Sequence, residues 1–414
     1  MPGITLIQLV SEQAMPNLLA AMAIQPDRIV HLCTDTPKTR KGSDSLRRAY
    51  KAASLHLEVT AERLSAMPAM REVRDVVARL LREDEKAVLN FTGGTKLMSI
   101  GAYAAALVCK RPSFYVDTSG NTFVDGGTAP GIDDLFPDGD TSISQIDRRL
   151  SVPHVAIANG VERVDGGKNW KPFLPLATFL LENDTIEAQV QQWATEICKN
   201  QPFDFKKRQA WILERYEQPL PDMLEAIAGP AIESGLFEHR DGGLFLSAGR
   251  KERIEAVEFD SGPKPFRDFR GMQEFLAAFN EAVMPLQFLQ GTWWEVAVAD
   301  HLSRRDDCRD IRWSVQVGSR GADNTDMEED ILGIADSLNL LYVSCKRGGD
   351  KGKLSRYLEE TEASAKRVGG SFAKKVFAVC LRPKQRQWKQ LTGRAEELRI
   401  ELITREDILA GHAR

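Results

Sequence analysis

The sequence predicts a mixed α/β protein of three parts, and three observations support this prediction. Strand-like runs alternate with helical stretches through about the first 145 residues. The last part follows the order helix, strand, strand, strand, helix, strand, and the part between is mostly helical. A length of 414 residues agrees with two or three domains. We place the boundaries at 1–145, 146–280 and 281–414.

The composition is that of an ordinary globular protein, with 43% hydrophobic and 28% charged residues. No apolar run is long enough to span a membrane, and the first residues lack the pattern of a signal peptide. The six cysteines are scattered without a C-x-x-C pair, which argues against a zinc site and favours a reducing compartment. We therefore expect a cytoplasmic protein without a membrane partner.

The first part has the alternation that is typical of a parallel, doubly wound sheet. The polar stretch 34–44 is expected to be a loop, and the hairpin 114–124 is expected at the end of the domain. The strands before that hairpin are predicted at 4–10, 28–33 and 86–91, and the helices at 18–24, at 70–82 and in a stretch ending at 52.

One loop of this part predicts a ligand site. Residues 90–98, NFTGGTKLM, follow a strand and open a helix rich in small residues. The two glycines allow a ligand to approach the backbone, Thr95 can cap the helix, and Lys96 adds a positive charge. Because ligands bind at the carboxyl ends of strands in open α/β sheets, this loop and the Ser11 loop predict a site for a phosphorylated nucleotide. The spacing is not that of a Walker A loop, and a tight turn without a ligand is the alternative.

The middle part is expected to be helical and to contain a β-hairpin at 235–246 with an Asp-Gly turn. Helices followed by such a hairpin suggest a winged-helix-like module. This module could bind DNA or serve as a rigid connector between the outer parts. We favour the connector, because Glu238 and Asp241 offset His239 and Arg240.

The stretch 326–346 of the last part predicts a hairpin that brings Asp330 and Lys346 to one edge of a sheet. Burying these two charges is unfavourable unless they pair or bind a metal. The arrangement suits phosphodiester hydrolysis, in which the carboxylate holds a divalent cation while the lysine orients water and offsets developing charge. Solvated surface charges are the alternative.

Basic residues are concentrated near this hairpin. The segment 340–390 has 13 Lys and Arg against four Asp and Glu, although the whole chain has a net charge of -4. Such a segment is the expected footprint of a phosphate-backbone partner. A solvated helix face is the alternative for about half of these charges.

The first part resembles the CARF domains of CRISPR ancillary nucleases of the Can and Card type, through a Ser-x-Gln-x-x-Pro-Asn loop at 11–17 and the glycine loop at 92–96. CARF domains are Rossmann-like sensors of cyclic oligoadenylates. The resemblance implies that cyclic tetra-adenylate binds across the two-fold axis of a homodimer. The residues that it implies for ligand contact are Ser11, Gln13, Asn17, Thr92, Gly93, Gly94, Thr95 and Lys96.

The last part resembles the PD-(D/E)xK nucleases, which have a restriction-endonuclease-like α/β core. Asp330 matches the first acid of the pattern, Lys346 its lysine, and Glu295, within the predicted helical stretch 275–302, its helix glutamate. Ser344 stands where the pattern has a carboxylate, so Glu328 or Glu295 supplies the missing charge or the site is impaired. The resemblance implies Mg²⁺ or Mn²⁺ held by Glu295 and Asp330, with help from the carbonyl of Cys345.

Together the two resemblances predict a metal-dependent endonuclease of type III CRISPR antiviral defence. Cyclic oligoadenylate would activate it, and it would cut DNA, RNA or both. A ligand-gated nucleic-acid-binding regulator with an inactive nuclease fold is the alternative, and Ser344 keeps it open.

Overall fold

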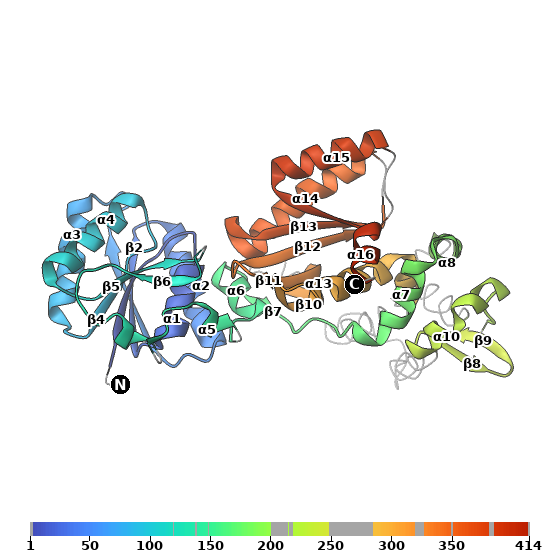
Figure 1. Ribbon diagram of the computed structural model, residues 1–414, viewed down its shortest axis with the longest axis horizontal. Helices are drawn as coiled ribbons and strands as arrows, with labels where there is room; N and C mark the ends of the chain where they lie inside the picture. The colour runs from blue at the N-terminus through green and yellow to red at the C-terminus, as the bar shows by residue number, and fades with distance from the viewer. Residues whose placement is uncertain are drawn as a thin grey trace, which may run out of the picture.

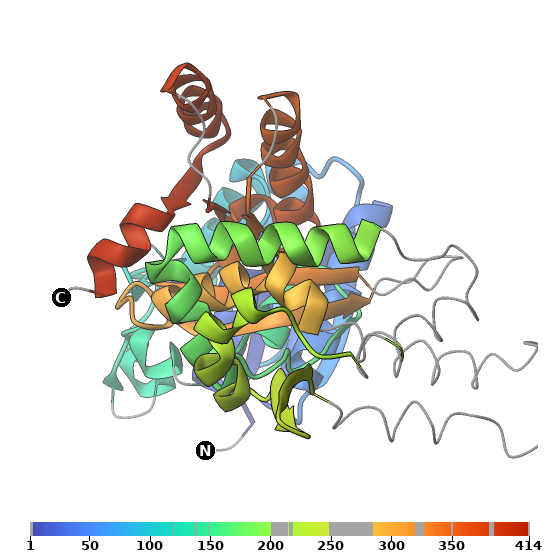
Figure 2. The same ribbon diagram turned by 90° about the vertical axis from the view of Figure 1, so that its right-hand side faces the viewer.

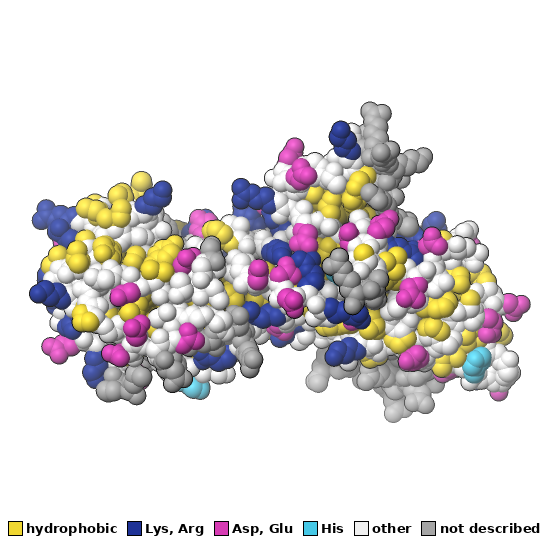
Figure 3. All heavy atoms as spheres, in the orientation of Figure 1, with side chains coloured by type: hydrophobic (Ala, Val, Ile, Leu, Met, Phe, Trp, Pro, Cys, Tyr) yellow, Lys and Arg dark blue, Asp and Glu magenta, His cyan; other side chains and the backbone are white. Residues whose placement is uncertain are grey.

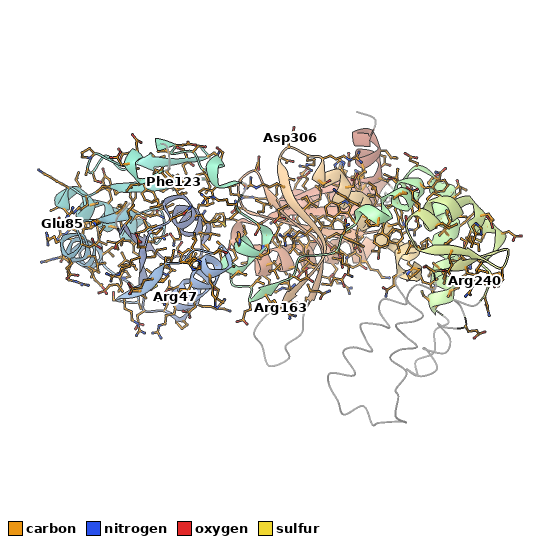
Figure 4. The ribbon with its side chains drawn as sticks, turned by 90° about the horizontal axis from the view of Figure 1, so that it is seen from below. Arg47, Glu85, Phe123, Arg163, Arg240 and Asp306 are labelled. Carbon is orange, nitrogen blue, oxygen red and sulfur yellow. The ribbon has the colours of Figure 1, made fainter. Side chains whose placement is uncertain are left out.

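The computed structural model describes residues 3–118, 120–136, 139–147, 149–199, 214, 218–247, 285–318, 327–348, 351–380 and 385–412. Three bodies follow one another along its long axis (Figure 1). Seen from below, Arg47 and Glu85 mark the N-terminal domain, Asp306 the C-terminal domain and Arg240 an outer module (Figure 4). The last part of the chain therefore lies between the first part and much of the middle. Among the described helices, none is long and apolar enough to cross a bilayer.

The N-terminal domain is the expected doubly wound domain. Its sheet has the order β3-β2-β1-β4-β5-β6, with parallel pairing except between β5 and β6. The strands are β1 (Thr5–Leu9), β2 (Arg28–Thr34), β3 (Glu58–Leu64), β4 (Ala87–Asn90), β5 (Ser113–Asp117) and β6 (Thr122–Asp125). The helices are α1 (Met15–Ile24), α2 (Pro37–Ala52), α3 (Met70–Glu83) and α4 (Lys96–Cys109).

Two details of this domain differ from the sequence prediction. β3 was not predicted, because its charged side chains mask the strand pattern, as is common at a sheet edge. The polar stretch 34–44 is mostly helix, since α2 begins at Pro37. Thr36 is its N-cap, and its side chain accepts the N–H of Thr39. A threonine followed by proline is a helix-start signal that the polar composition obscured.

The C-terminal domain has the expected order α13, β10, β11, β12, α14, β13. Its sheet has the order β14-β13-β12-β11-β10-β7, antiparallel from β7 to β12 and parallel from β12 to β14. The strands are β7 (Arg163–Val164), β10 (Cys308–Gly318), β11 (Met327–Ala335), β12 (Leu340–Lys346), β13 (Lys374–Val379) and β14 (Ile400–Thr404). The helices are α13 (Trp293–Ser303), α14 (Lys351–Gly369), α15 (Gln385–Leu398) and α16 (Arg405–His412). Residues 275–284 of the predicted helical stretch lie outside the described residues.

The middle part is divided between two sides of the C-terminal domain. Two short helices, α5 (Ser144–Asp147) and α6 (Val152–Ala158), lie with β7 next to the N-terminal domain. The other elements lie at the opposite end, where α8 crosses in front of the C-terminal domain (Figure 2). They are α7 (Leu174–Glu182), α8 (Asp184–Lys199), α10 (Glu225–Glu233), β8 (Phe237–Arg240) and β9 (Gly243–Leu246). The predicted hairpin is thus present, and it lies at the end of the molecule opposite to the N-terminal domain.

Two apolar clusters fix this arrangement. One runs from Leu18 on α1 through Val155 on α6 to Leu332 on β11, so it joins the N-terminal and C-terminal domains in one core. The other lies on the opposite face of the C-terminal sheet and joins Trp293 of α13 to Leu180 of α7. Because burial of apolar area is the main favourable term in folding, α7 is structurally part of the C-terminal domain.

A buried polar network in the N-terminal domain predicts a loss of stability in acid. His31 on β2 is fully buried, and its ring nitrogens contact the hydroxyls of Ser43 at 2.8 Å and Tyr50 at 3.1 Å. Burial, with a smaller contribution from Arg47, lowers the pKa of His31 to about 3. As the pH falls, the His31 imidazole is therefore protonated at a higher pH in the unfolded chain than in the folded protein. Stability present above about pH 6.5 is lost as the pH falls toward 3, by about 1.4 kcal/mol per pH unit.

We expect His31→Gln to lose this contribution to the pH dependence in thermal melts between about pH 7.5 and about pH 5. His239→Gln changes an exposed histidine and should melt with the wild-type dependence. An unchanged dependence in His31→Gln would show that the network does not hold a neutral imidazole.

Candidate functional sites

A cavity of about 970 Å³ lies between the N-terminal and C-terminal domains. One wall is formed by the loops after β1, β2 and β4 and by the starts of α2 and α4. The other is formed by α6, by the edges of β10 and β11, and by the end of α14. Lys38, Lys41, Lys366 and Arg367 line it, and Glu12 is the acid among its described lining residues. This excess of positive charge suits an anionic ligand.

Four of the eight residues predicted to contact the ligand line this cavity: Ser11, Gln13, Gly94 and Thr95. The Thr95 hydroxyl accepts the N–H of Met98 at 3.3 Å, so Thr95 caps α4 as expected. The start of α4 therefore borders the cavity, where its free N–H groups favour an anion.

Asn17 and Gly93 shape the loops and are not among the described residues that line the cavity. Asn17 is 1% exposed and donates from its side chain to the carbonyl of Leu9 at 3.0 Å. A Cβ at Gly93 would lie 2.1 Å from the same carbonyl oxygen, so only glycine allows the loop to pass so close to β1.

Thr92 and Lys96 are likewise not among the described residues that line the cavity. The Thr92 hydroxyl donates to the side chain of Asn90 at 2.7 Å and accepts the N–H of Val116 at 2.7 Å. Its hydrogen bonds hold the loop against β5. Lys96 is exposed on the first turn of α4.

Sequence reasoning missed the contributions of α2 and of the C-terminal domain to the cavity. The helix-start signal at Thr36, with Lys38 and Lys41 behind it, could have indicated the first. Nothing local to the sequence indicates the second, because Arg367 reaches the cavity through the packing of two domains.

Asp330 and Lys346 meet at one end of the C-terminal sheet. The paired register of β11 and β12 ends at Ile331 and Val343. Beyond this pair, an oxygen of Asp330 accepts the main-chain N–H of Cys345 at 2.7 Å. The same oxygen lies 3.4 Å from Nζ of Lys346 and 3.5 Å from the hydroxyl of Ser344. These distances form the ion pair that the hairpin predicted.

A local irregularity in β10 and β11 turns Asp330 toward this end. In a regular strand, residues two positions apart share a face. Here Glu329 and Ile331 face opposite sides of the sheet instead. Ile331 packs in the apolar cluster on the α13 side, whereas Glu329 contacts Tyr342, which belongs to the cluster shared with the N-terminal domain. Opposite Asp330, Ser314 has a φ of 52°, in the left-handed region. Such irregularities re-aim side chains next to active sites.

Glu295 adds a second carboxyl group to this site. It lies in the first turn of α13, is half-buried, and accepts a hydrogen bond from the indole N–H of Trp313 at 2.9 Å. Burial, followed by the charge of Asp330, raises the pKa of Glu295 to about 8. The two acids are therefore close enough to repel each other, and Glu295 holds a proton at neutral pH unless a cation takes its place.

Lys346 remains an ammonium group. Burial is the largest single effect and would lower its pKa. The charge and hydrogen bond of Asp330, together with Cys345 and Glu295, outweigh burial, so the pKa is raised above its ordinary value. Its Nζ also lies 5.7 Å from the centre of the Tyr357 ring on α14. A protonated lysine cannot remove a proton from water, but it can bind a phosphate and offset negative charge that develops there.

Glu328 and Cys345, which were also predicted at the active site, are held by other contacts. Glu328 is held by the Ser314 hydroxyl and lies 3.5 Å from Nζ of Lys168, although its charge also acts on Glu295. The side chain of Cys345 belongs to the apolar core, so only its main chain is available to a metal. Over the described part of the chain, no three His, Cys, Asp or Glu side chains form a metal-binding group.

The basic segment 340–390 is only partly available to a nucleic acid. At least six of its Lys and Arg side chains form ion pairs within the chain: Lys346, Arg347, Arg356, Arg367, Lys374 and Lys375. Acids of the same chain therefore partly neutralise these six charges.

The middle part of the chain supports the end of β12. Arg347, next to Lys346, forms hydrogen bonds of 2.6 and 3.1 Å with the carboxylate of Glu187 on α8, which is 1% exposed. Arg405 donates to the carbonyl of Leu181 at the end of α7 at 2.8 Å. Charge-assisted hydrogen bonds of this kind are strong, so α7 and α8 help to position the lysine.

Comparison with protein-family models identifies the family of both sheet domains. Residues 5–126 match the Card1 CARF domain, and residues 283–410 match the Card1-like endonuclease domain. The chain belongs to the Card1-like CARF endonucleases. No curated protein matches it. The two matched regions coincide with the two sheets, so the CARF domain borders the cavity and the endonuclease domain holds Asp330 and Lys346.

Solved structures share this fold. Can2 from Sulfobacillus thermosulfidooxidans, in complex with cyclic tetra-adenylate, is 16% identical, with a TM-score of 0.63 over 99% of this chain and 97% of that one. Protein VC1899 from Vibrio cholerae is 14% identical, with a TM-score of 0.67 over 99% and 96%. A type III CRISPR defence DNA nuclease activated by cyclic oligoadenylate is 17% identical, with a TM-score of 0.52; 92% of this chain matches 46% of that longer one.

Proposed function

We propose that this protein is a metal-dependent endonuclease of type III CRISPR defence that cyclic oligoadenylate activates. The observation that carries the proposal is the convergence of Asp330, Glu295 and Lys346 in an endonuclease domain joined to a CARF domain. A strand acid, a helix acid and a lysine on the adjoining strand form the set that phosphodiester hydrolysis needs.

The donor set fits Mg²⁺ or Mn²⁺. Asp330 and Glu295 are two oxygen ligands, and magnesium sites commonly use one or two carboxylates together with water and substrate phosphate. Burial and the charge of Asp330 keep a proton on Glu295, and a divalent cation would offset both effects. When bound, the ion would polarise the phosphate and lower the pKa of a coordinated water.

The remaining residues of the site act by position and charge. The N–H of Cys345 and the ammonium of Lys346 fix the carboxylate of Asp330. Trp313 holds Glu295 through its indole N–H. Lys346 is then placed to bind the scissile phosphate, because its ammonium lies beside Asp330 and is part-exposed.

Cyclic tetra-adenylate is the proposed activator. A ring of AMP units carries one phosphate per nucleotide, which suits the cationic interdomain cavity and the start of α4. The Can2 structure contains this ligand in a chain of the same fold. Closure around it would act on both domains at once, because both form walls of the cavity.

We also propose a homodimer formed through α4. Its exposed residues Leu97, Ile100, Leu107 and Val108 recur at helical spacing on one face, each more than half exposed. Apolar side chains gather where α3 and α4 lie (Figure 3). An apolar patch of this kind on a CARF domain suits a second copy of the same chain, since a two-fold interface is self-complementary.

The double variant Leu107→Glu/Val108→Glu is therefore expected to be monomeric in light scattering after size exclusion, whereas the wild type is dimeric. Charged side chains within such an interface cannot be buried favourably without partners. Met223→Glu makes the same kind of change at a part-exposed apolar residue of the outer module and should remain dimeric. A dimeric double variant would contradict this interface.

A plasmid-nicking assay with Mn²⁺ tests the proposed activity. Cleavage is expected in the presence of cyclic tetra-adenylate and not without it. Parallel single-stranded DNA and RNA substrates identify the nucleic acid. Ligand-dependent DNA binding without any cleavage would instead favour the regulator with an inactive nuclease fold, the alternative that Ser344 keeps open.

A further inference from the structure

One arginine of the endonuclease domain lies between the cavity and the catalytic strand. Arg367 is in the last turn of α14, where it lines the interdomain cavity. Its guanidinium donates to an oxygen of Glu329 at 2.8 Å. The Glu329 side chain is 5% exposed, and its other oxygen accepts the hydroxyl of Tyr342 at 2.7 Å.

This ion pair is adjacent to the catalytic residues. Glu329 immediately precedes Asp330, at the irregularity that turns Asp330 toward the active site. In the first half of α14, the ring of Tyr357 lies 5.7 Å from Nζ of Lys346. One helix thus lines the ligand cavity with its last turn, contacts Lys346 through Tyr357, and contacts Glu329, the neighbour of Asp330, through Arg367.

We propose that Arg367 binds a phosphate of the ligand in competition with Glu329, and that this exchange links the cavity to the position of Asp330. The inference rests on the proposed function, because it takes cyclic oligoadenylate as the ligand. Arg367 is 44% exposed, so it is open to the cavity while paired. A guanidinium fork fits phosphate and carboxylate alike.

The exchange has a direct consequence for β11. Glu329 is buried, and Arg367 and Tyr342 hold its carboxylate by an ion pair and a hydrogen bond. When phosphate draws Arg367 away, the Glu329 carboxylate loses its cation and its present position becomes less favourable. The ligand then favours a second arrangement of the segment that carries Asp330, as it must if it is to change activity by binding.

Calorimetric titration of the full-length protein with cyclic tetra-adenylate tests the inference. Arg367→Gln is expected to bind the ligand about ten- to a hundredfold more weakly, since a charge-assisted hydrogen bond is lost. Glu329→Gln should bind it several-fold more tightly, because Arg367 is released from its competing carboxylate. Opposite effects at the two ends of one ion pair cannot come from general destabilisation.

Arg394→Gln removes an arginine of α15 that pairs with Glu359 and Glu397, and should bind as the wild type does. Arg367→Lys keeps the positive charge but lacks the two-pronged guanidinium, and it should bind the ligand with intermediate affinity. This variant replaces Arg367→Gln in the test if Arg367→Gln does not fold. Wild-type affinity in Arg367→Gln, or weaker binding by Glu329→Gln, would overturn the exchange. A wild-type protein that binds no cyclic tetra-adenylate would overturn the proposed activator itself, and this inference with it.

Discussion

Asp330→Asn and Lys346→Met are each expected to reduce cleavage by at least about a thousandfold while leaving the affinity for cyclic tetra-adenylate unchanged. Asp330→Asn keeps the shape of the side chain but removes the charge that a cation needs. Lys346→Met keeps an unbranched stem but removes the ammonium that lies 3.4 Å from Asp330. Plasmid nicking with saturating ligand and Mn²⁺ gives the rate, and calorimetry gives the affinity.

The matched control is Lys374→Met. Lys374 is also a lysine of the same sheet paired with an aspartate, at 2.8 Å from Asp307, but it lies at the other end of the parallel strands. Its loss should lower the melting temperature without removing cleavage. Cleavage by Lys346→Met at the wild-type rate would show that the ammonium does not act on the scissile phosphate and would defeat the assignment.

Chelation of divalent cations should abolish cleavage, and Mn²⁺ should restore it with an affinity that depends on pH. Because the pKa of Glu295 is raised to about 8, the carboxyl holds a proton below that pH. A cation that binds there must displace the proton. The apparent affinity for Mn²⁺ should therefore fall about tenfold for each pH unit below 8, and binding should release about one proton.

Calorimetry in two buffers of different ionisation enthalpy measures the proton release. Glu295→Gln should bind Mn²⁺ more weakly and release no proton. Glu401→Gln changes an acid of the same domain that pairs with Arg305, and it should behave as the wild type. Mn²⁺ binding that is equally strong at about pH 6.5 and about pH 8.5 would argue against Glu295 as a ligand.

Local sequence signals were sufficient for most of the fold. Apolar runs such as 340–343 and the loop at 92–95 have few structural alternatives, and they became β12 and the start of α4. β3 was missed because it carries three charged residues, Glu58, Glu62 and Arg63, none of them buried. In a strand at the edge of a sheet, solvent rather than packing selects many side chains, so periodicity alone is a weak guide.

The candidate active site was predictable because its residues are close in sequence or belong to a spaced motif. Asp330 and Lys346 come from one hairpin, and their pairing follows from strand register. The ligand cavity was only half predictable. Arg367 enters it from a helix more than 250 residues away from the Thr95 loop, and only the packing of two domains brings them together.

The contact between Arg347 and Glu187 limits how this enzyme can be dissected. A fragment that begins near residue 281 would keep the motif of the endonuclease domain but lose α8, which holds the arginine next to Lys346. It would also expose the apolar surface of α13 that α7 covers. A transplantable cutting unit would therefore need residues 170–199 as well, joined to the rest by a designed linker. Fusing the matched region 283–410 alone to another sensor would yield an insoluble or misaligned chimera.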